Sequence, residues 1–135
     1  MRVSAARSLQ ILQKYNSLYP EPKRPFLHNM LREWEAEKPL KGFRILHNLV
    51  NSYETLLKLE PLVASGAELT VTAFDLIKLP FQDKIDQIIN EAGLRFVPDY
   101  KYAGGEYDIV LDCGARSLAI PGLRITKGIV ELTRT

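Results

Sequence analysis

The spacing of apolar residues predicts two amphipathic helices at the amino-terminal end of the chain. Ala5, Leu9 and Leu12 share one face of the first helix. The second helix is marked by apolar residues at the i, i+3, i+4 and i+7 spacing, namely Leu27, Met30, Leu31 and Trp34. Pro39 then ends the helical pattern.

From residue 43 onward the pattern changes to short apolar runs that alternate with helical periodicity. Residues 43–50 form an apolar run that is typical of a strand buried on both faces. Further strands are predicted over 68–74, 94–97, 108–111 and 129–133, with a loop over 99–106. Helices are predicted over 53–65 and around 85–92, and Gly66 and Gly93 stop them.

Strands that alternate with helices are typical of a parallel sheet with right-handed crossovers. We therefore expect an α/β fold: a Rossmann-like or flavodoxin-like three-layer domain with a parallel sheet of about five strands. Residues 1–37 should form a helical segment that packs on the core, and residues 38–135 the sheet domain itself. Ligands of such sheets bind beyond the carboxyl ends of the strands, which here means residues 50–54, 74–77, 112–116 and 131–135.

Composition narrows the class of protein. The chain has 135 residues, of which 46% are hydrophobic and 25% charged, and its formal net charge is +2. These values are typical of one globular domain and give no electrostatic reason to expect a nucleic acid or a membrane surface as partner. The single cysteine, Cys113, excludes an internal disulfide and favours a reducing, cytoplasmic location. It lies far in sequence from His28 and His47, so no metal-ligand spacing is present.

Four blocks of the sequence resemble S-adenosylhomocysteine hydrolase, in the same order as in that family. The segment KPLKGFRI (38–45) resembles the family's KPLKGARI, LVNSYET (49–55) its LHMTxET, LDCG (111–114) its LDDGG, and GIVELTRT (128–135) its GxSEETTTG. The resemblance implies a divergent form of the family's substrate-side domain. In the family, a separate NAD-binding domain follows this domain along the chain. No GxGxxG turn occurs in this chain. The chain alone is therefore expected to carry no catalytic residues and no cofactor. NAD would belong to a longer parent protein that is cut at Thr135.

The resemblance assigns roles only to the residues that match. It implies that Ser52, Glu54, Thr55 and Asp112 contact an adenine nucleoside. It also implies that two terminal threonines, Thr133 and Thr135, contact NAD.

Three positions depart from the family. The histidine of the second block is Val50, an aspartate of the third is Cys113, and a ribose-binding glutamate of the last is Leu132. Nucleoside hydroxyls left without partners cost about 1–3 kcal/mol each, so we expect weak binding and no catalysis.

Several residues have a second interpretation. If Asn51 is the N-cap, Glu54 occupies the third helical position and could complete a capping box, although Ser52 is an alternative cap. His47 is interpreted as a core histidine. The alternative function is a non-enzymatic regulatory or scaffolding module that kept the fold and lost the pocket. A domain cut at Thr135 would expose apolar surface and could dimerise through it. Convergent polar groups at the strand ends would favour nucleoside binding, whereas an apolar patch around Val50 and Leu132 would favour the module.

Overall fold

The computed structural model describes residues 3–17, 25–73 and 79–132. Two helices, α1 (Ala5–Asn16) and α2 (Pro25–Glu37), precede the sheet domain. The sheet domain consists of β1 (Arg44–Asn48), α3 (Tyr53–Ala64), β2 (Glu68–Thr72), α4 (Gln82–Glu91), β3 (Arg95–Val97), η1 (Tyr100–Tyr102), β4 (Gly105–Asp112), η2 (Arg116–Ala119) and β5 (Leu123–Glu131).

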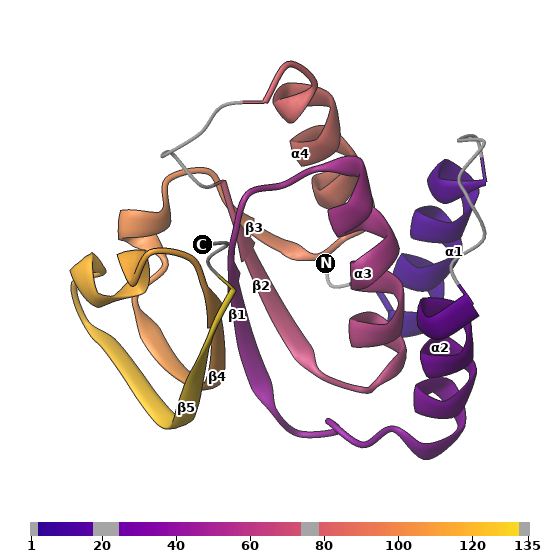
Figure 1. The fold of residues 1–135 in the computed structure, drawn as a ribbon, viewed down its shortest axis with the longest axis horizontal. Helices are drawn as coiled ribbons and strands as arrows, with labels where there is room; N and C mark the ends of the chain where they lie inside the picture. Colours follow the sequence, from indigo (N-terminus) through magenta and orange to yellow (C-terminus); the bar gives the residue numbers. More distant parts are fainter. Residues whose placement is uncertain (1–2, 18–24, 74–78, 133–135) are drawn as a thin grey trace.

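The five strands form one parallel sheet in the order β3-β2-β1-β4-β5 (Figure 1). The central strand β1 pairs with β2 on one side and with β4 on the other, and both pairings are parallel. This position explains the apolar run around β1, because both of its faces and both of its edges are covered. The predicted α/β fold with a parallel sheet of about five strands is confirmed.

The two faces of the sheet are covered differently. On one face α3 and α4 pack against the strands, and α1 and α2 lie on the outer side of α3 (Figure 1). On the other face Leu46 and Val110 pack against Tyr100 of the short 3-10 helix η1 and against Ile120, which directly follows the 3-10 helix η2. The short connections on either side of β4 therefore cover the sheet with single helical turns instead of α-helices.

The sequence explains where α3 begins and ends. Ser52 is its N-cap: the side chain accepts a hydrogen bond from the amide of Thr55, and the Thr55 hydroxyl accepts one from the amide of Ser52. This reciprocal pair satisfies two amides at the helix start. Asn51 is therefore not the N-cap, and the alternative cap, Ser52, is confirmed. After the helix Gly66 has φ +85°, a left-handed conformation that glycine adopts without steric cost.

Two predicted strand boundaries are wrong. β4 begins at Gly105, so Gly105 and Glu106 belong to a strand and not to the predicted loop. β5 begins at Leu123, six residues before the predicted start at residue 129, because it pairs with β4 from Gly105 onward. An irregularity in the pairing between Tyr107 and Ile109 leaves an extra residue in β5, which breaks its two-residue periodicity. The sequence pattern therefore hides the first half of β5.

Candidate functional site

The strand order places the candidate site between β1 and β4. From β1 the chain proceeds to β2 and β3 on one side, and it then returns to β4 on the other side of β1. The loops that follow β1 and β4 therefore diverge, and open α/β sheets bind their ligands in the crevice where this reversal occurs. We call this region the carboxyl-edge site and define it as residues 49–55, residues 112–117 and Glu131.

Buried polar side chains join the strand ends beneath the site. The Asn48 amide group donates a hydrogen bond to Asp112 Oδ1 at 3.1 Å. The Thr72 hydroxyl donates to Asn48 Oδ1 at 2.6 Å. All three residues are fully buried, and they come from β1, β4 and β2. Because buried polar groups are stable only when paired, this chain of bonds fixes the three strand ends relative to one another.

The carboxylate of Asp112 orders the loop that follows β4. Oδ1 also accepts a hydrogen bond from the amide of Cys113 at 2.9 Å. Oδ2 accepts bonds from the amide of Ser117 at 2.9 Å and from the Ser117 hydroxyl. Four donors thus converge on one buried carboxylate. Asp112 therefore orders the turn that follows β4, while its contact with a nucleoside stays a prediction.

The same loop also binds the end of β5. Gly114 and Ala115 both have positive φ angles, 65° and 55°. Their amides donate to the carboxylate of Glu131 at 2.6 and 3.1 Å. Successive amides that point to one side form a concave anion-binding turn, and here the anion is a side chain of the same protein. Glu131 therefore holds the end of β5 against the loop after β4.

The loop between β1 and α3, together with the first turn of α3, contains three of the predicted ligand residues. Ser52 and Thr55 form the capping box, and the Thr55 hydroxyl also donates to the carbonyl of Val50 at 3.1 Å. Thr55 is buried and Ser52 is half-buried. Glu54 is exposed in the first turn of α3, where the helix dipole favours a carboxylate. Because Thr55 occupies the capping-box position, Glu54 does not complete that motif.

A buried cluster that the sequence analysis missed connects this loop to α4. The Asn51 amide group donates to the carbonyl of Thr72 at 2.9 Å and to Asp86 Oδ1 at 3.1 Å. Gln82 donates to the same Asp86 oxygen at 2.7 Å. The side-chain carbonyls of Asn51 and Gln82 have no hydrogen-bond partner among the described residues. The sequence signal for this cluster was a polar residue, Asn51, directly after the apolar run of residues 43–50.

His47 lies in the core on β1. It is fully buried, and burial together with the charge of Lys58 lowers its pKa to about 3. Burial also lowers the pKa of Lys58 to about 8. Neither ring nitrogen of His47 has a hydrogen-bond partner within the part of the chain that the structure describes. The interpretation of His47 as a core histidine is confirmed.

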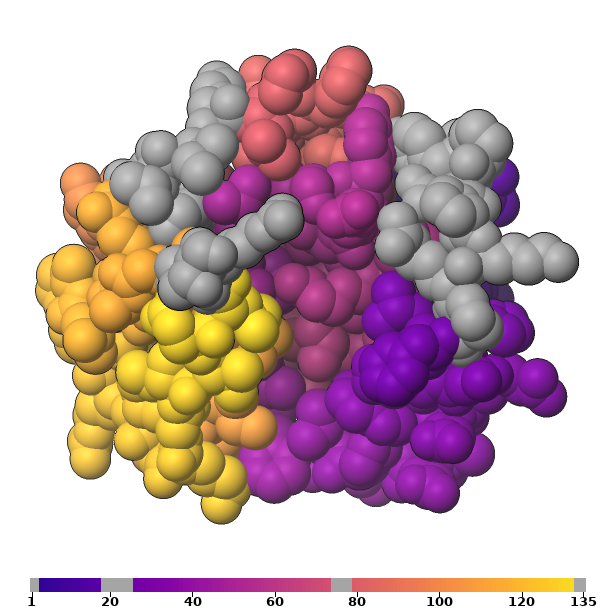
Figure 2. All heavy atoms as spheres, viewed as in Figure 1, coloured from indigo at the N-terminus to yellow at the C-terminus, as the bar shows by residue number. Residues whose placement is uncertain are grey.

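Apolar or weakly polar side chains occupy the three positions at which this chain departs from the S-adenosylhomocysteine hydrolase motifs. Val50 and Cys113 are half-buried at the strand ends. Leu132 is 48% exposed, and its amide donates to the carbonyl of Asp112 at 2.8 Å. Ile129 and Val130 on β5 are also exposed, and Figure 2 shows this carboxyl-terminal strand across one face of the molecule. The predicted NAD contacts, Thr133 and Thr135, lie outside the described residues.

The loop between β1 and α3 does not fit the pyrophosphate of NAD. A dinucleotide turn needs glycines so that the backbone can approach the phosphates closely. Here residues 49–52 contain no glycine, and the amide of Thr55 already bonds the Ser52 side chain. This loop therefore offers no close approach to the phosphates of a dinucleotide.

Within residues 3–17, 25–73 and 79–132, no group of three or more His, Cys, Asp or Glu could hold a metal ion. No helix in the same ranges has the length and apolar character needed to cross a bilayer.

Comparison with the models of known protein families finds no match to this chain. The resemblance to S-adenosylhomocysteine hydrolase therefore stays a hypothesis that rests on the four sequence blocks.

Proposed function

We propose that the carboxyl-edge site binds a small polar ligand of the adenine-nucleoside class, without catalysis by this chain alone. The observation that carries the proposal is the exposed carboxylate of Glu54, which lies at the start of α3 beside the reversal in strand order. This is the position at which open α/β sheets bind ligands. The hydrogen bonds of Asp112 order the facing loop before any ligand arrives.

The chemistry of Glu54 suits an adenine ring. A carboxylate accepts hydrogen bonds, and the exocyclic amino group of adenine donates them. The half-buried side chains of Val50 and Cys113 would offer apolar contact to the base. Leu132 cannot bond a ribose hydroxyl, and each hydroxyl that loses its partner costs about 1–3 kcal/mol. We therefore expect affinity in the millimolar range, and selectivity for the base over the sugar.

The test is calorimetric titration of the full chain with adenosine, alongside the variant Glu54→Gln. The variant replaces an acceptor-only group with one that also presents donors, so binding should weaken at least about tenfold. Glu33→Gln, on the exposed face of α2, is the matched control and should bind as the unmodified protein does. Absence of adenosine binding at millimolar concentration would contradict the proposal, as would equal binding by Glu54→Gln.

The exposed edge strand favours a second candidate function, a non-enzymatic module that self-associates. Within the part of the chain that the structure describes, β5 has no strand on its outer side, and it carries exposed Ile129 and Val130 followed by exposed Leu132. An unpaired apolar edge is a template for pairing with a second chain. Sedimentation over a range of protein concentrations should then show a dimer that Val130→Lys disrupts. A monomer at all concentrations would exclude this candidate.

A further inference from the structure

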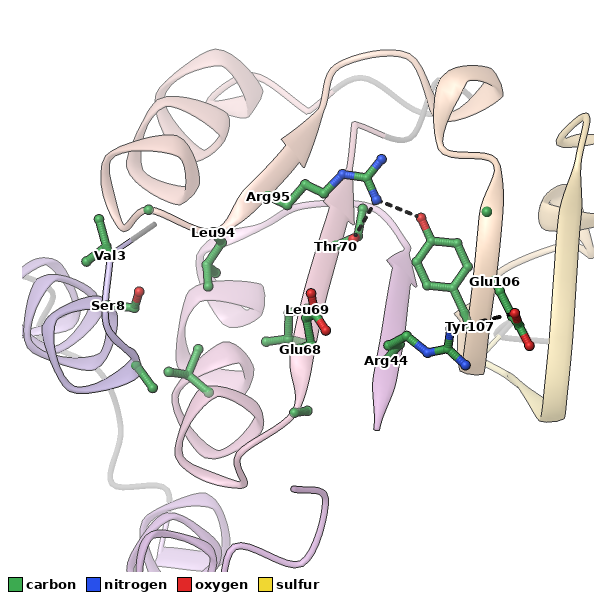
Figure 3. Close-up of a pocket in the computed structure, with 15 residues that line it drawn as sticks. Val3, Ser8, Arg44, Glu68, Leu69, Thr70, Leu94, Arg95, Glu106 and Tyr107 are labelled. Carbon is green, nitrogen blue, oxygen red and sulfur yellow. Dashed lines mark hydrogen bonds and ion pairs between the residues drawn. The ribbon is translucent and has the colours of Figure 1, made fainter. Parts of the chain in front are cut away.

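A second candidate site lies at the opposite end of the sheet. A cavity of about 600 Å³ opens across the amino ends of the strands (Figure 3), a volume typical of small-molecule sites. Its polar lining includes Arg44, Glu68, Thr70, Arg95, Glu106 and Tyr107. A five-residue strand spans about 16 Å, so this cavity is well separated from the carboxyl-edge site.

The guanidinium of Arg95 is held in place over the cavity. Its Nη1 donates to the hydroxyls of Thr70 and Tyr107, at 3.2 Å in each case. The Tyr107 hydroxyl donates in turn to the carbonyl of Ala103 at 2.8 Å. Tyr107 is only 4% exposed, so its hydroxyl is a fixed acceptor. Figure 3 shows Arg95, Thr70 and Tyr107 converging from β3, β2 and β4.

This arrangement leaves one edge of the guanidinium available. Both hydrogen bonds of Arg95 use Nη1, and no acceptor among the described residues bonds Nε or Nη2. Nε and Nη2 form a parallel pair of donors that matches the two oxygens of a carboxylate. Arg44 differs, because its guanidinium already bonds Asp108 at 3.3 and 3.4 Å and lies 3.8 Å from Glu106. Among the described residues, Arg95 is thus the cation that the cavity offers to a ligand.

The charge of the lining limits the anion. The described residues of the cavity wall include two arginines and two glutamates, Glu68 and Glu106, so their formal charges cancel. A polyanion such as a phosphate ester would gain one available arginine but would face both glutamates. A single carboxylate needs only the one pair of donors on Arg95. The lining therefore favours a monocarboxylate.

The other end of the cavity is apolar. Val63 and Leu69 line it and are 4% and 6% exposed, so they present a packed hydrocarbon wall. Val3 closes the end, because it lies directly on Gly93, where an added Cβ would approach Val3 Cγ2 to 2.4 Å. Only glycine permits this contact. A ligand anchored at Arg95 would therefore extend an apolar body toward Val3.

We propose that this cavity binds a small organic monocarboxylate with an apolar body, anchored by the Nε–Nη2 edge of Arg95. Thr70 and Tyr107 position the guanidinium, and Val63 and Leu69 contact the body of the ligand. The site is independent of nucleoside binding at the carboxyl edge.

The test is a two-dimensional amide NMR titration of the full chain with 4-phenylbutyrate, and with 4-phenylbutan-1-ol as the probe without a carboxylate. The acid should give saturable shifts at Thr70, Arg95 and Tyr107, and the alcohol should bind at least about tenfold more weakly. Arg95→Gln should raise the dissociation constant of the acid by a similar factor. Arg32→Gln, an exposed substitution of the same type on α2, should leave it unchanged.

Tyr107→Phe keeps the ring and removes one of the two acceptors that hold Arg95, so it should weaken binding of the acid severalfold. The amide spectrum of each variant shows directly whether it is folded. Equal affinity for the acid and the alcohol would overturn the proposal, as would unchanged binding by Arg95→Gln. Shifts confined to residues 52–55 and 113–116 would also overturn it and would assign the acid to the carboxyl-edge site instead.

Discussion

Buried His47 should make the protein sensitive to mild acid. In the native state its pKa is about 3, whereas the ordinary value of 6.5 applies to the unfolded chain. Between these two values the unfolded chain binds a proton that the native protein excludes. The stability contributed by neutral His47 is therefore fully present above pH 6.5, and it is lost as the pH falls toward 3.

The size of the effect follows from the two pKa values. Each pH unit within this window changes the free energy of unfolding by about 1.4 kcal/mol per excluded proton. Acidification from about pH 7 to about pH 5 should therefore cost about 2 kcal/mol. Asp108 does not contribute between about pH 7 and about pH 5, because its ordinary pKa of 3.8 already lies below this range and bonds from Arg44 and Thr126 lower the pKa further.

The assay is urea unfolding at both pH values, followed by the fluorescence of Trp34, the single tryptophan. His47→Leu should remove most of the 2 kcal/mol difference, because leucine has no proton to bind. The control is His28→Gln, on the exposed face of α2, which should retain the difference. If His47→Leu loses as much stability on acidification as the unmodified protein does, the reasoning about His47 is refuted.

Three further predictions follow from buried and strained groups. Asp112→Ala removes the acceptor of four hydrogen bonds and should lower the free energy of unfolding by about 3 kcal/mol or more, measured by urea titration; an effect below 1 kcal/mol would contradict this. Ala115→Gly relieves a left-handed conformation at φ 55° and should stabilise by about 0.5–1 kcal/mol in thermal unfolding, whereas no gain would show that the loop is unstrained. Burial lowers the pKa of the Lys58 ammonium to about 8, so its charged form is destabilised at neutral pH. Lys58→Met removes this charge and should raise the free energy of unfolding by about 1–2 kcal/mol in the urea assay. A lower free energy of unfolding in the variant would contradict this.

The periodicity of the sequence was sufficient to predict the class of fold. Apolar runs and stop signals at Gly66 and Gly93 placed β1, α3, β2 and α4 within a few residues of their observed bounds. β5 was located poorly, because the irregular pairing between Tyr107 and Ile109 disturbs its alternation and Gly128 resembles a turn residue. The order of the strands depends on contacts between distant segments, and no local pattern encodes it.

The candidate site was predictable in position and less so in detail. Parallel strands bring their carboxyl ends to one edge, so residues 50–54 and 112–116 could be expected to face each other. The partners of Asp112, namely Asn48 and Ser117, could not be expected, because only the folded sheet brings Asn48 within 3.1 Å of Asp112. The cavity at Arg95 could not be predicted for the same reason. Thr70, Arg95 and Tyr107 lie on three different strands, and only the folded sheet brings them together.

The most direct test of nucleoside binding at the carboxyl-edge site is an amide NMR titration of the full chain with adenosine. If adenosine binds at the carboxyl-edge site, residues 52–55 and 113–116, in and beside the loops after β1 and β4, should show saturable shifts. These shifts should be lost in Glu54→Gln. The amides of Thr70, Arg95 and Tyr107 at the other end of the sheet should not move. Shifts that fail to saturate, or that centre on Arg95, would contradict nucleoside binding at the carboxyl edge.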